Sequence, residues 1–463
     1  MDKKTCTLAR ASLLAVAFLM QASAQDRYLV RAPSPEIGRI AARHNLTILR
    51  SLDGSAGNLH LLAAPAGADV MRTMQGLQAD ASVQGVEPDV NVNLPEKSPG
   101  APLRQMGLPD PAPLNDRILV PYYTTFAWDA YVNQPATTII KVTQGHTYAT
   151  GTGAVVAFLD TGVDFAQPVL AKSLLWGYDF TRNIPGGSEM ADVNQSTDSI
   201  LDQSTDSILD QSTDSILDRK AALVLNQSTT AILDQSTDSI LDQNPSQLPS
   251  EFGHGTMVAG LIHLVAPTAK LLPVKVFTSD GTATLSNIVS GIYWAANNGA
   301  DVINMSFSST QPSSELLAAI TYANSKGVVC VASVGNDGKQ MMVYPAGYHS
   351  LVIGVASTNN QETLSSFSNY GPQLVTLAAP GEAVVTLYPG NNYAEGWGTS
   401  FAAPLVSGGA AMLVQMGGSR VNEAQATQAL SQADPTGQGL GAGELDLPKA
   451  CSDELQLLHG GGK

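Results

Sequence analysis

Residues 153–162 read GAVVAFLDTG, an unbroken apolar run that ends in an aspartate and a glycine-containing turn. Strands that are buried on both faces of a sheet have this composition. Similar runs recur along the chain at 269–277, 300–308 and 328–336, and helical segments lie between them at 284–299 and 313–327. This alternation predicts an α/β fold, in which a parallel sheet has helices on both sides.

Several polar residues stand at or just after the ends of these predicted strands. They include Asp160, Ser306 and Asn336. In open parallel sheets the ligand site lies at the carboxyl ends of the strands. We therefore expect the chemistry of the protein at these positions.

The composition of the 463-residue chain narrows the classes of function. With 44% hydrophobic and 14% charged residues, it is typical of a packed globular protein rather than a disordered one. The formal net charge is −16, and because an acidic surface repels phosphate backbones, we expect no nucleic-acid partner. The spacing of His and Cys residues in the sequence suggests no metal site.

The first segment, 1–24, is typical of a secretory signal peptide. Lys3, Lys4 and Arg10 form a basic start, an apolar run follows at 11–20, and residues 22–24 are small enough for cleavage. The apolar run is shorter than the ~20 residues that span a bilayer, although a retained anchor is the alternative. We therefore expect an exported protein, secreted or periplasmic, with no retained membrane span.

Residues 25–97 form a separate unit by their pattern. Two predicted helices, 34–46 and 68–80, stand among four strand-like segments. The order strand, helix, strand, strand, helix, strand is that of a small α+β ferredoxin-like domain. We expect a linker at 98–124, a second domain at 125–451 and a tail at 452–463.

An eight-residue unit, QSTDSILD, recurs between Gln195 and Asp242. In a helix an eight-residue period drifts by about 80° per repeat, so it makes no lasting apolar stripe. A small solenoid of short strands and a solvated acidic loop both remain open. Because the cost of loop closure grows slowly with length, we interpret 195–242 as an insertion into the second domain. Our hypothesis is that it projects near the rim of the expected site, where it filters what reaches that site or tethers the protein.

Four residues in glycine-rich stretches supply a complete set of hydrolytic roles; they are Asp160, His254, Asn336 and Ser400. A serine hydroxyl needs an adjacent base, and imidazole suits that task near neutral pH. The base needs a carboxylate to hold its tautomer, and a developing oxyanion needs fixed hydrogen-bond donors. Taken singly, each residue also has a structural interpretation, as a turn residue, a loop histidine or a helix cap.

The chain resembles the subtilisin-like serine proteases in three motifs. They are VVAFLDTGVD at 155–164, GHGTMVAG at 253–260 and GTSFAAPLVSG at 398–408, in the order Asp, His, Ser. The resemblance covers residues 125–450 apart from the repeat. It implies a subtilisin-like fold and a serine endopeptidase that hydrolyses polypeptides through an acyl-enzyme. The unit at 25–97 resembles the propeptide of these enzymes, which implies a self-processing zymogen with its own propeptide as folding aid and inhibitor.

The resemblance also assigns roles to individual residues. It implies that Ser400 is the nucleophile, His254 the general base and then acid, and Asp160 its orienting carboxylate. The Asn336 side chain and the Ser400 N–H would form the oxyanion hole. The substrate-binding strand, which would pair with an extended peptide, is represented by Ser306, Phe307 and Ser308. By the same analogy we expect a cis peptide bond between residues 344 and 345.

The chain departs from the pattern of the family in three places. Ser308 and Ser309 stand where relatives usually have glycines, which should narrow the pocket for the residue before the cut. Val169 stands where many relatives have a calcium-binding aspartate, so we expect that calcium site to be lost and no cofactor to be needed. Phe401 replaces a methionine and so removes a thioether that oxidises to a disruptive sulfoxide.

Two other functions remain open. The first is a non-catalytic binding protein on the same scaffold, with the acidic repeat as its interaction surface. The second is an α/β-hydrolase esterase, whose nucleophile elbow reads G-x-S-x-G and whose triad runs Ser, acid, His. Here the serine stretch is GTSFA at 398–402 and the serine comes last, which counts against the esterase.

Overall fold

The computed structural model describes residues 27–95, 117–196, 248–418, 421–437 and 439–460. The expected signal peptide at 1–24 lies outside the described residues. The same holds for most of the predicted linker and for all but the first two residues of the octapeptide repeat.

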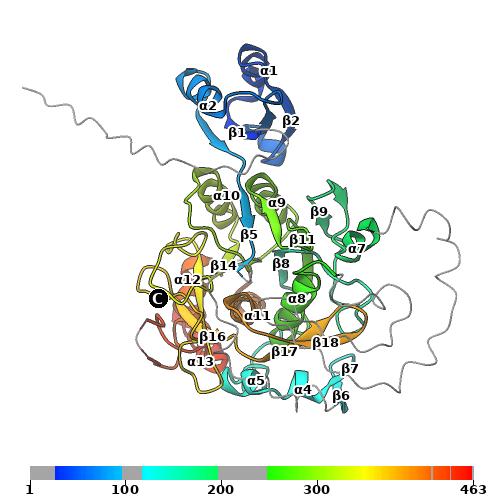
Figure 1. Cartoon of the computed structure of the whole chain (residues 1–463). Coiled ribbons are helices and arrows are strands. Elements are labelled where there is room, and N and C mark those ends of the chain that lie inside the picture. Colours follow the sequence, from blue (N-terminus) through cyan, green and yellow to red (C-terminus); the bar gives the residue numbers. More distant parts are fainter. Residues whose placement is uncertain (1–26, 96–116, 197–247, 419–420, 438, 461–463) are drawn as a thin grey trace, which may run out of the picture.

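The N-terminal unit is a four-stranded antiparallel sheet with two helices on one side (Figure 1). Its elements are β1 (Arg27–Arg31), α1 (Ser34–Arg43), β2 (Thr47–Ser51), β3 (Leu59–Ala63), α2 (Val70–Ala79) and β4 (Gly85–Pro88), with a short 3₁₀ turn at Gly54–Ala56. The strand order β2-β3-β1-β4 is that of a ferredoxin-like domain. Tyr28, Ile40 and Leu77 belong to a hydrophobic cluster of its own. The predicted element order is therefore confirmed.

An eight-stranded sheet, with the order β10-β9-β11-β8-β13-β14-β15-β16, forms the centre of the second domain. The strands are β8 (Val155–Asp160), β9 (Tyr178–Asp179), β10 (Ile184–Pro185), β11 (Lys270–Lys275), β13 (Val302–Met305), β14 (Val329–Ser333), β15 (Ile353–Thr358) and β16 (Leu377–Pro380). All neighbours are parallel except the short β9–β10 pair. The predicted parallel sheet is confirmed, and β8 lies in its interior between β11 and β13.

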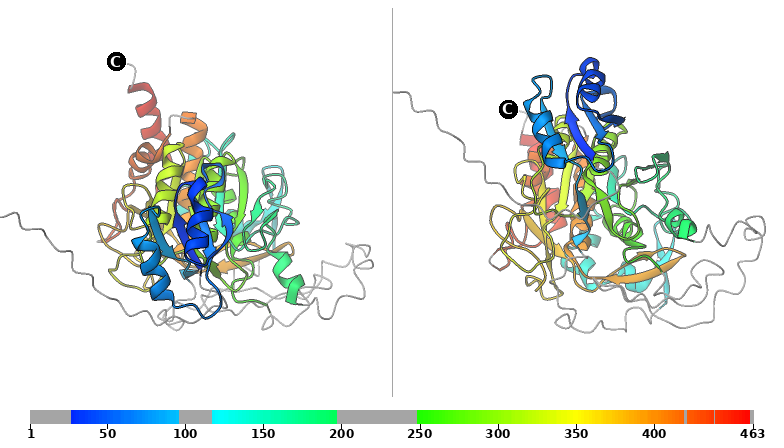
Figure 2. Two further views of the ribbon diagram at one scale, coloured as in Figure 1. Left: turned by 90° about the horizontal axis from the view of Figure 1, so that it is seen from above. Right: turned by 45° about the horizontal axis from the view of Figure 1, so that its top comes forward.

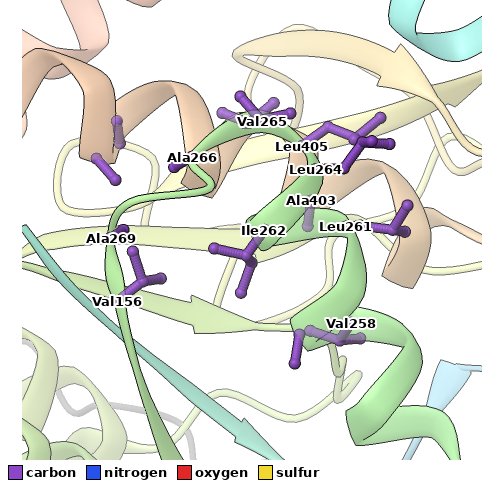
Figure 3. Packing of buried hydrophobic residues seen from close by; sticks show 14 of the residues in the cluster. Val156, Val258, Leu261, Ile262, Leu264, Val265, Ala266, Ala269, Ala403 and Leu405 are labelled. Carbon is purple, nitrogen blue, oxygen red and sulfur yellow. The ribbon is translucent and has the colours of Figure 1, made fainter. Parts of the chain in front are cut away.

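Successive residues of β8 point to opposite faces of the sheet, so each face has its own core. Val156 and Phe158 belong to one hydrophobic cluster, together with α8 (His254–Val265) and α11 (Thr399–Gly417). Ala157 and Leu159 belong to another, together with α9 (Leu285–Asn297) and α10 (Ser314–Ser325). Figure 3 shows side chains of α8 against Val156, Ala403 and Leu405.

Helix α11 is apolar on all sides because it runs through the middle of this core. Among the described segments it is the one helix long and apolar enough to cross a membrane, and 89% of that stretch is buried inside the protein. A buried core helix has this composition in a globular protein. The apolarity of α11 therefore reflects its packing.

Shorter elements complete the second domain. They are β6 (Leu119–Tyr122), β7 (Thr125–Trp128), α4 (Asp129–Val132), α5 (Pro135–Ile139), α6 (Val142–Gly145), α7 (Met190–Ser196), β17 (Val384–Tyr388), β18 (Asn392–Gly396), α12 (Glu423–Leu430) and α13 (Leu447–Gly460). Two expected boundaries differ from these elements. The predicted linker 98–124 ends in a hairpin, β6–β7. The predicted tail 452–463 starts inside α13, which packs against α11 because its buried residues complete the core around that helix.

The N-terminal unit lies over α9 and α10 of the second domain (Figures 1 and 2). After β4 the chain extends as β5 (Asn91–Asn93), which pairs antiparallel with β12 (Thr282–Thr284) just before α9. Arg31 of β1 also forms an ion pair with Glu315 of α10. The two units are thus joined by a shared two-stranded sheet and by polar contacts.

Candidate active site

Asp160 and His254 meet where the carboxyl end of β8 faces the first turn of α8. The distance between His254 Nδ1 and Asp160 Oδ1 is 2.7 Å, and the side chains are 3% and 0% exposed. The Thr161 N–H donates to the same Asp160 oxygen at 2.7 Å. A buried carboxylate in this position favours the tautomer that carries its proton on Nδ1, which leaves Nε2 as the basic nitrogen.

A glycine brings α8 close enough to β8 for this contact. A Cβ atom at position 255 would lie 1.9 Å from the carbonyl oxygen of Gly162, a distance that no side chain can occupy. The Gly255 N–H instead donates to Thr161 Oγ1 at 2.9 Å. The second glycine of the GHGT motif, Gly255, is therefore required because the backbones of α8 and of the turn after β8 approach closely. This close approach positions His254 beside Asp160.

Ser400 lies in the first turn of α11 and contacts the end of β13. Its Oγ donates to the carbonyl oxygen of Ser306 at 3.2 Å, and Ser306 Oγ donates to the carbonyl oxygen of Ser400 at 2.9 Å. The ring of Phe401, the next residue, has its centroid 5.5 Å from that of His254. The structure thus places the start of α11 beside both His254 and the end of β13.

Asn336 follows β14 and is fixed against the same helix start. Its Oδ1 accepts from the N–H of Thr399 at 2.9 Å and from Thr399 Oγ1 at 2.8 Å. The Gly335 N–H donates to Thr399 Oγ1 at 3.1 Å. Because the Asn336 oxygen is held toward Thr399, its NH₂ group points away from Thr399. Thr399 is the residue directly before Ser400.

The three predicted substrate-binding residues lie in different environments. Ser306 is fully buried and bonded to Ser400 rather than open to a peptide. The Phe307 ring, 1% exposed, lines a cavity of about 250 Å³ together with Leu285 and Ile288. Ser308 is half-buried, and its Oγ lies 3.2 Å from where a Cβ on Gly335 would stand. Only Ser308 of the three has a polar side chain near a solvent-accessible surface.

The cis peptide bond expected between Tyr344 and Pro345 is present. Tyr344 exchanges both backbone hydrogen bonds with Ser309, each at 2.8 Å. The chain after β13 is therefore held by the segment that carries the cis bond.

One buried acid beside this constellation was not predicted from the sequence. Glu189 is 0% exposed and accepts hydrogen bonds from Thr161, Gly253 and Thr256, which flank Asp160 and His254. Burial raises its pKa to about 7. Its sequence surroundings, GGSEM at 186–190, show neither a periodic pattern nor a motif, so no local signal marks it.

Within the described ranges, no group of three or more His, Cys, Asp or Glu residues is placed to hold a metal ion. Val169, at the position expected to have lost a calcium ligand, is an apolar side chain that is 5% exposed. The expected loss of this calcium site and of any cofactor stays a prediction.

A family model described as the subtilase family matches residues 151–443, more than half of the 463 residues. The chain belongs to the subtilase family. The matched region contains Asp160, His254, Asn336 and Ser400, whereas the N-terminal unit of this subtilase lies outside it.

Individual relatives of this subtilase match parts of it. Subtilisin BL from Lederbergia lenta is 43% identical over 173 residues, which cover 35% of this chain and 63% of the relative. Thermitase from Thermoactinomyces vulgaris is 32% identical over 293 residues, which cover 61% of this chain and 82% of thermitase. This subtilase thus spans less than two thirds of the length of Subtilisin BL.

The fold extends the likeness to the N-terminal unit. The crystal structure of fervidolysin from Fervidobacterium pennivorans, described as a keratinolytic enzyme related to subtilisin, superimposes with a TM-score of 0.65 at 22% identity. The match covers 92% of this chain and 61% of fervidolysin. At this level of identity the likeness concerns the fold alone.

Proposed function

We propose that this subtilase is an exported serine endopeptidase that is made as a self-processing zymogen and cuts polypeptides through an Asp-His-Ser triad. The observation that carries the proposal is the 2.7 Å hydrogen bond between the buried Asp160 and His254 at the start of α8. A buried acid–imidazole pair beside a serine at a helix N-terminus is the arrangement that activates a hydroxyl nucleophile. Membership of the subtilase family supports the same reaction.

In the proposed reaction, the Ser400 hydroxyl turns from the Ser306 carbonyl toward His254 Nε2 and attacks the scissile carbonyl carbon. His254 takes the hydroxyl proton and gives it to the leaving amine, while Asp160 stabilises the imidazolium. Water, activated by His254, then hydrolyses the acyl-enzyme. The charge on the tetrahedral oxygen would be met by the Asn336 NH₂ group and by the Ser400 N–H, because the first N–H groups of a helix lack intrahelical partners.

The zymogen part of the proposal rests on how the N-terminal unit meets the second domain. β5 adds an antiparallel strand to β12, and the Leu94 N–H donates to the Gly281 carbonyl oxygen at 3.0 Å. Extended peptides bind exposed sheet edges in this way, so residues 91–94 would occupy the path of a substrate. Val92 and Leu94 are 5% and 1% exposed and belong to the hydrophobic cluster around α9 and α10, so their side chains pack against the second domain.

Two acids of the N-terminal unit also contact helix N-termini of the second domain. Asp89 accepts from the N–H and the hydroxyl of Ser286, both at 2.9 Å, at the start of α9. Glu87 accepts from the Ser314 N–H at 2.5 Å and from Ser313 Oγ at 2.6 Å at the start of α10. Negative groups are stabilised at helix N-termini, so these contacts favour a bound, inhibitory unit.

The test compares the purified full chain with a Ser400→Ala variant on a mixed peptide library. We expect internal cleavage by the first and a rate lower by about 10⁶ for the variant, a factor measured in subtilisin itself. The variant should also accumulate as uncut precursor. A full chain that binds peptides and leaves all of them uncut would instead favour the non-catalytic binding protein.

A further inference from the structure

Glu189 connects the two segments that carry Asp160 and His254. Its Oε2 accepts from the Gly253 N–H at 3.1 Å and from Thr161 Oγ1 at 3.3 Å, and its Oε1 accepts from the Thr256 hydroxyl. Thr161 follows Asp160 directly, whereas Gly253 is the N-cap of α8 and Thr256 lies in its first turn. One carboxylate therefore bridges the end of β8 and the start of α8.

Two of the three residues that donate to Glu189, Thr161 and Thr256, have further contacts near the site. Thr161 uses its N–H for Asp160 Oδ1 and its hydroxyl oxygen for the Gly255 N–H. Thr256 Oγ1 accepts from the Asp164 N–H at 2.8 Å, which ties the turn after β8 to α8. The hydrogen bonds of Glu189 and those of Asp160 and His254 thus form one connected network through Thr161 and the start of α8.

We infer that Glu189 is a positioning residue of the triad, which holds His254 in line with Asp160 through Thr161, Gly253 and Thr256. The inference deepens the proposed function and rests on it. All three contacts donate to Glu189, and an ionised carboxylate, which only accepts, satisfies all of them. An amide in its place has one acceptor oxygen and presents N–H groups to some of these donors, so the network must shift.

The charged surroundings of Glu189 come from several elements. Asp160 of β8 and Asp164 of the following turn disfavour its ionisation, whereas Lys275 of β11 favours it. Tyr388 of β17 also faces it, and the charge of Glu189 contributes to a raised pKa of that phenol. Lys275 Nζ donates to the carbonyl oxygen of Thr161 at 2.6 Å, so this cation is fixed beside the same strand end.

Glu189 lies close in sequence to the octapeptide insertion. It immediately precedes α7, the helix that runs into the first two residues of the octapeptide repeat. The segment that leads into the insertion therefore carries a residue on which the catalytic geometry depends.

The experiment expresses the full chain of the wild type and of Glu189→Gln, lets each mature, and measures kcat and KM of the matured protein on a short peptide ester. A small displacement of His254 relative to the reacting serine slows the chemical step more than it weakens substrate binding. We therefore expect kcat to fall by about 10- to 100-fold, with KM within about twofold. Glu444→Gln is the matched control, because Glu444 is a second buried acid and its carboxylate accepts from Thr358 rather than from the triad segments. We expect the control to keep kcat within about twofold while its melting temperature falls.

Thr161→Val provides a second test that does not depend on the folding of Glu189→Gln. It removes the hydroxyl between Glu189 and Gly255 at constant shape and should also lower kcat at unchanged KM. A folded Glu189→Gln with wild-type kcat, or an equal loss of kcat in Glu444→Gln, would overturn the inference while leaving the proposed function intact. An inactive wild type would overturn the proposed function and, with it, the role of Glu189.

Discussion

Thr399 connects two parts of the candidate site, the Asn336 side chain and Ser400. Its N–H and hydroxyl hold the Asn336 oxygen, and the next residue is Ser400. Because both contacts come from the first residue of α11, the helix start positions the amide and the serine together. At this scale, the side chains around Ser400 determine which substrates and reagents the site tolerates.

Ser308 should restrict the residue before the cut. Its hydroxyl lies next to Gly335, which precedes Asn336, so it occupies space beside the proposed oxyanion hole. We expect Ser308→Gly to raise kcat/KM for peptides with phenylalanine before the cut by about tenfold relative to alanine, since pocket size is worth about 1–3 kcal/mol. Paired peptide substrates that differ at this one position provide the measurement. An unchanged ratio would show that Ser308 does not form the pocket wall.

Phe401 should make the activity tolerant of peroxide. Its ring is 4% exposed and packs beside the ring of His254, where a methionine would place an oxidisable sulfur. We expect the wild type to keep most of its activity in dilute peroxide and Phe401→Met to lose most of it under the same treatment. Residual hydrolysis over time is the readout. Equal rates of loss in both proteins would argue against this explanation.

Whole elements carry the contact between the two units. The first N–H groups of α9 and α10 lack partners within their own helices. The stretch around the end of β4 brings an acid to each helix, Glu87 within β4 and Asp89 directly after it. The same segment continues into β5, so the helix contacts and the strand pairing are set by one stretch of backbone.

Loss of one helix-capping acid should weaken the proposed inhibition by the N-terminal unit. Glu87→Ala leaves the Ser314 N–H and the Ser313 hydroxyl without this acceptor, and a hydrogen bond to a charged group is worth about 1.5–3 kcal/mol. We expect the inhibition constant of residues 25–97, added as a separate chain to the mature enzyme, to rise by about 10- to 100-fold. Glu36→Ala is the control, because Glu36 pairs with Arg39 on the exposed side of α1. A similar rise for both variants would mean that net charge matters rather than the cap.

The whole molecule buries several acids in the second domain, and these set its dependence on pH. Burial raises the pKa of Glu423 to about 8 and the pKa values of Glu189 and Glu444 to about 7. Such groups favour the folded state at pH values below their unfolded pKa, near 4.5, and this stability is lost as the pH rises through 7 and 8. Asp434 acts in the opposite direction, because hydrogen bonds from Lys141 and Lys449 lower its pKa to about 2, and its contribution is lost in acid.

Thermal stability should therefore be greatest at mildly acidic pH. We expect the melting temperature to fall by about 5 °C or more between pH 6 and pH 9. Glu423→Gln should make this fall smaller, because it removes the carboxyl group whose pKa is raised most among the three. Scanning calorimetry across this range measures both curves. A melting temperature that rises between pH 6 and pH 9 would contradict the assignment.

The octapeptide insertion should be dispensable for hydrolysis of small substrates. Its stem is anchored before the repeat, since Asp192 bonds to Lys275 and to Ser279, each at 2.7 Å. A chain that lacks Gln195–Asp242 keeps Asp192 and Glu189, so we expect kcat/KM on a peptide ester within about threefold of the wild type. Abolished hydrolysis in a folded deletion would show that the repeat belongs to the catalytic machinery.

Much of the fold and of the candidate site could be predicted because the signals are local. The apolar run before Asp160 reflects a strand that is buried on both faces, and the glycines at 253 and 255 reflect the close packing of the backbone around His254. Each pattern lies within a few residues. The element order of the N-terminal unit follows from periodicity in the same way. The β6–β7 hairpin and the continuation of α13 past residue 451 were not predicted. Tyr122 and Ala127 of the hairpin belong to the hydrophobic cluster around α8 and α11, and α13 packs against α11, so both depend on segments that are distant in sequence.

The amino-acid sequence by itself determined the α/β class and the element order of the N-terminal unit, and it marked Asp160, His254, Asn336 and Ser400 as the candidate site residues, because each has a short, contiguous pattern. Only the tertiary structure decided that Glu189 joins β8 to α8, that Glu87 and Asp89 meet α10 and α9, and that Glu423 is buried. The contacts of Glu189 and Glu87 join residues that are 28 to 228 positions apart along the chain. The physical reason is that hydrogen bonding and burial depend on proximity in space, which packing creates between segments that share no local pattern.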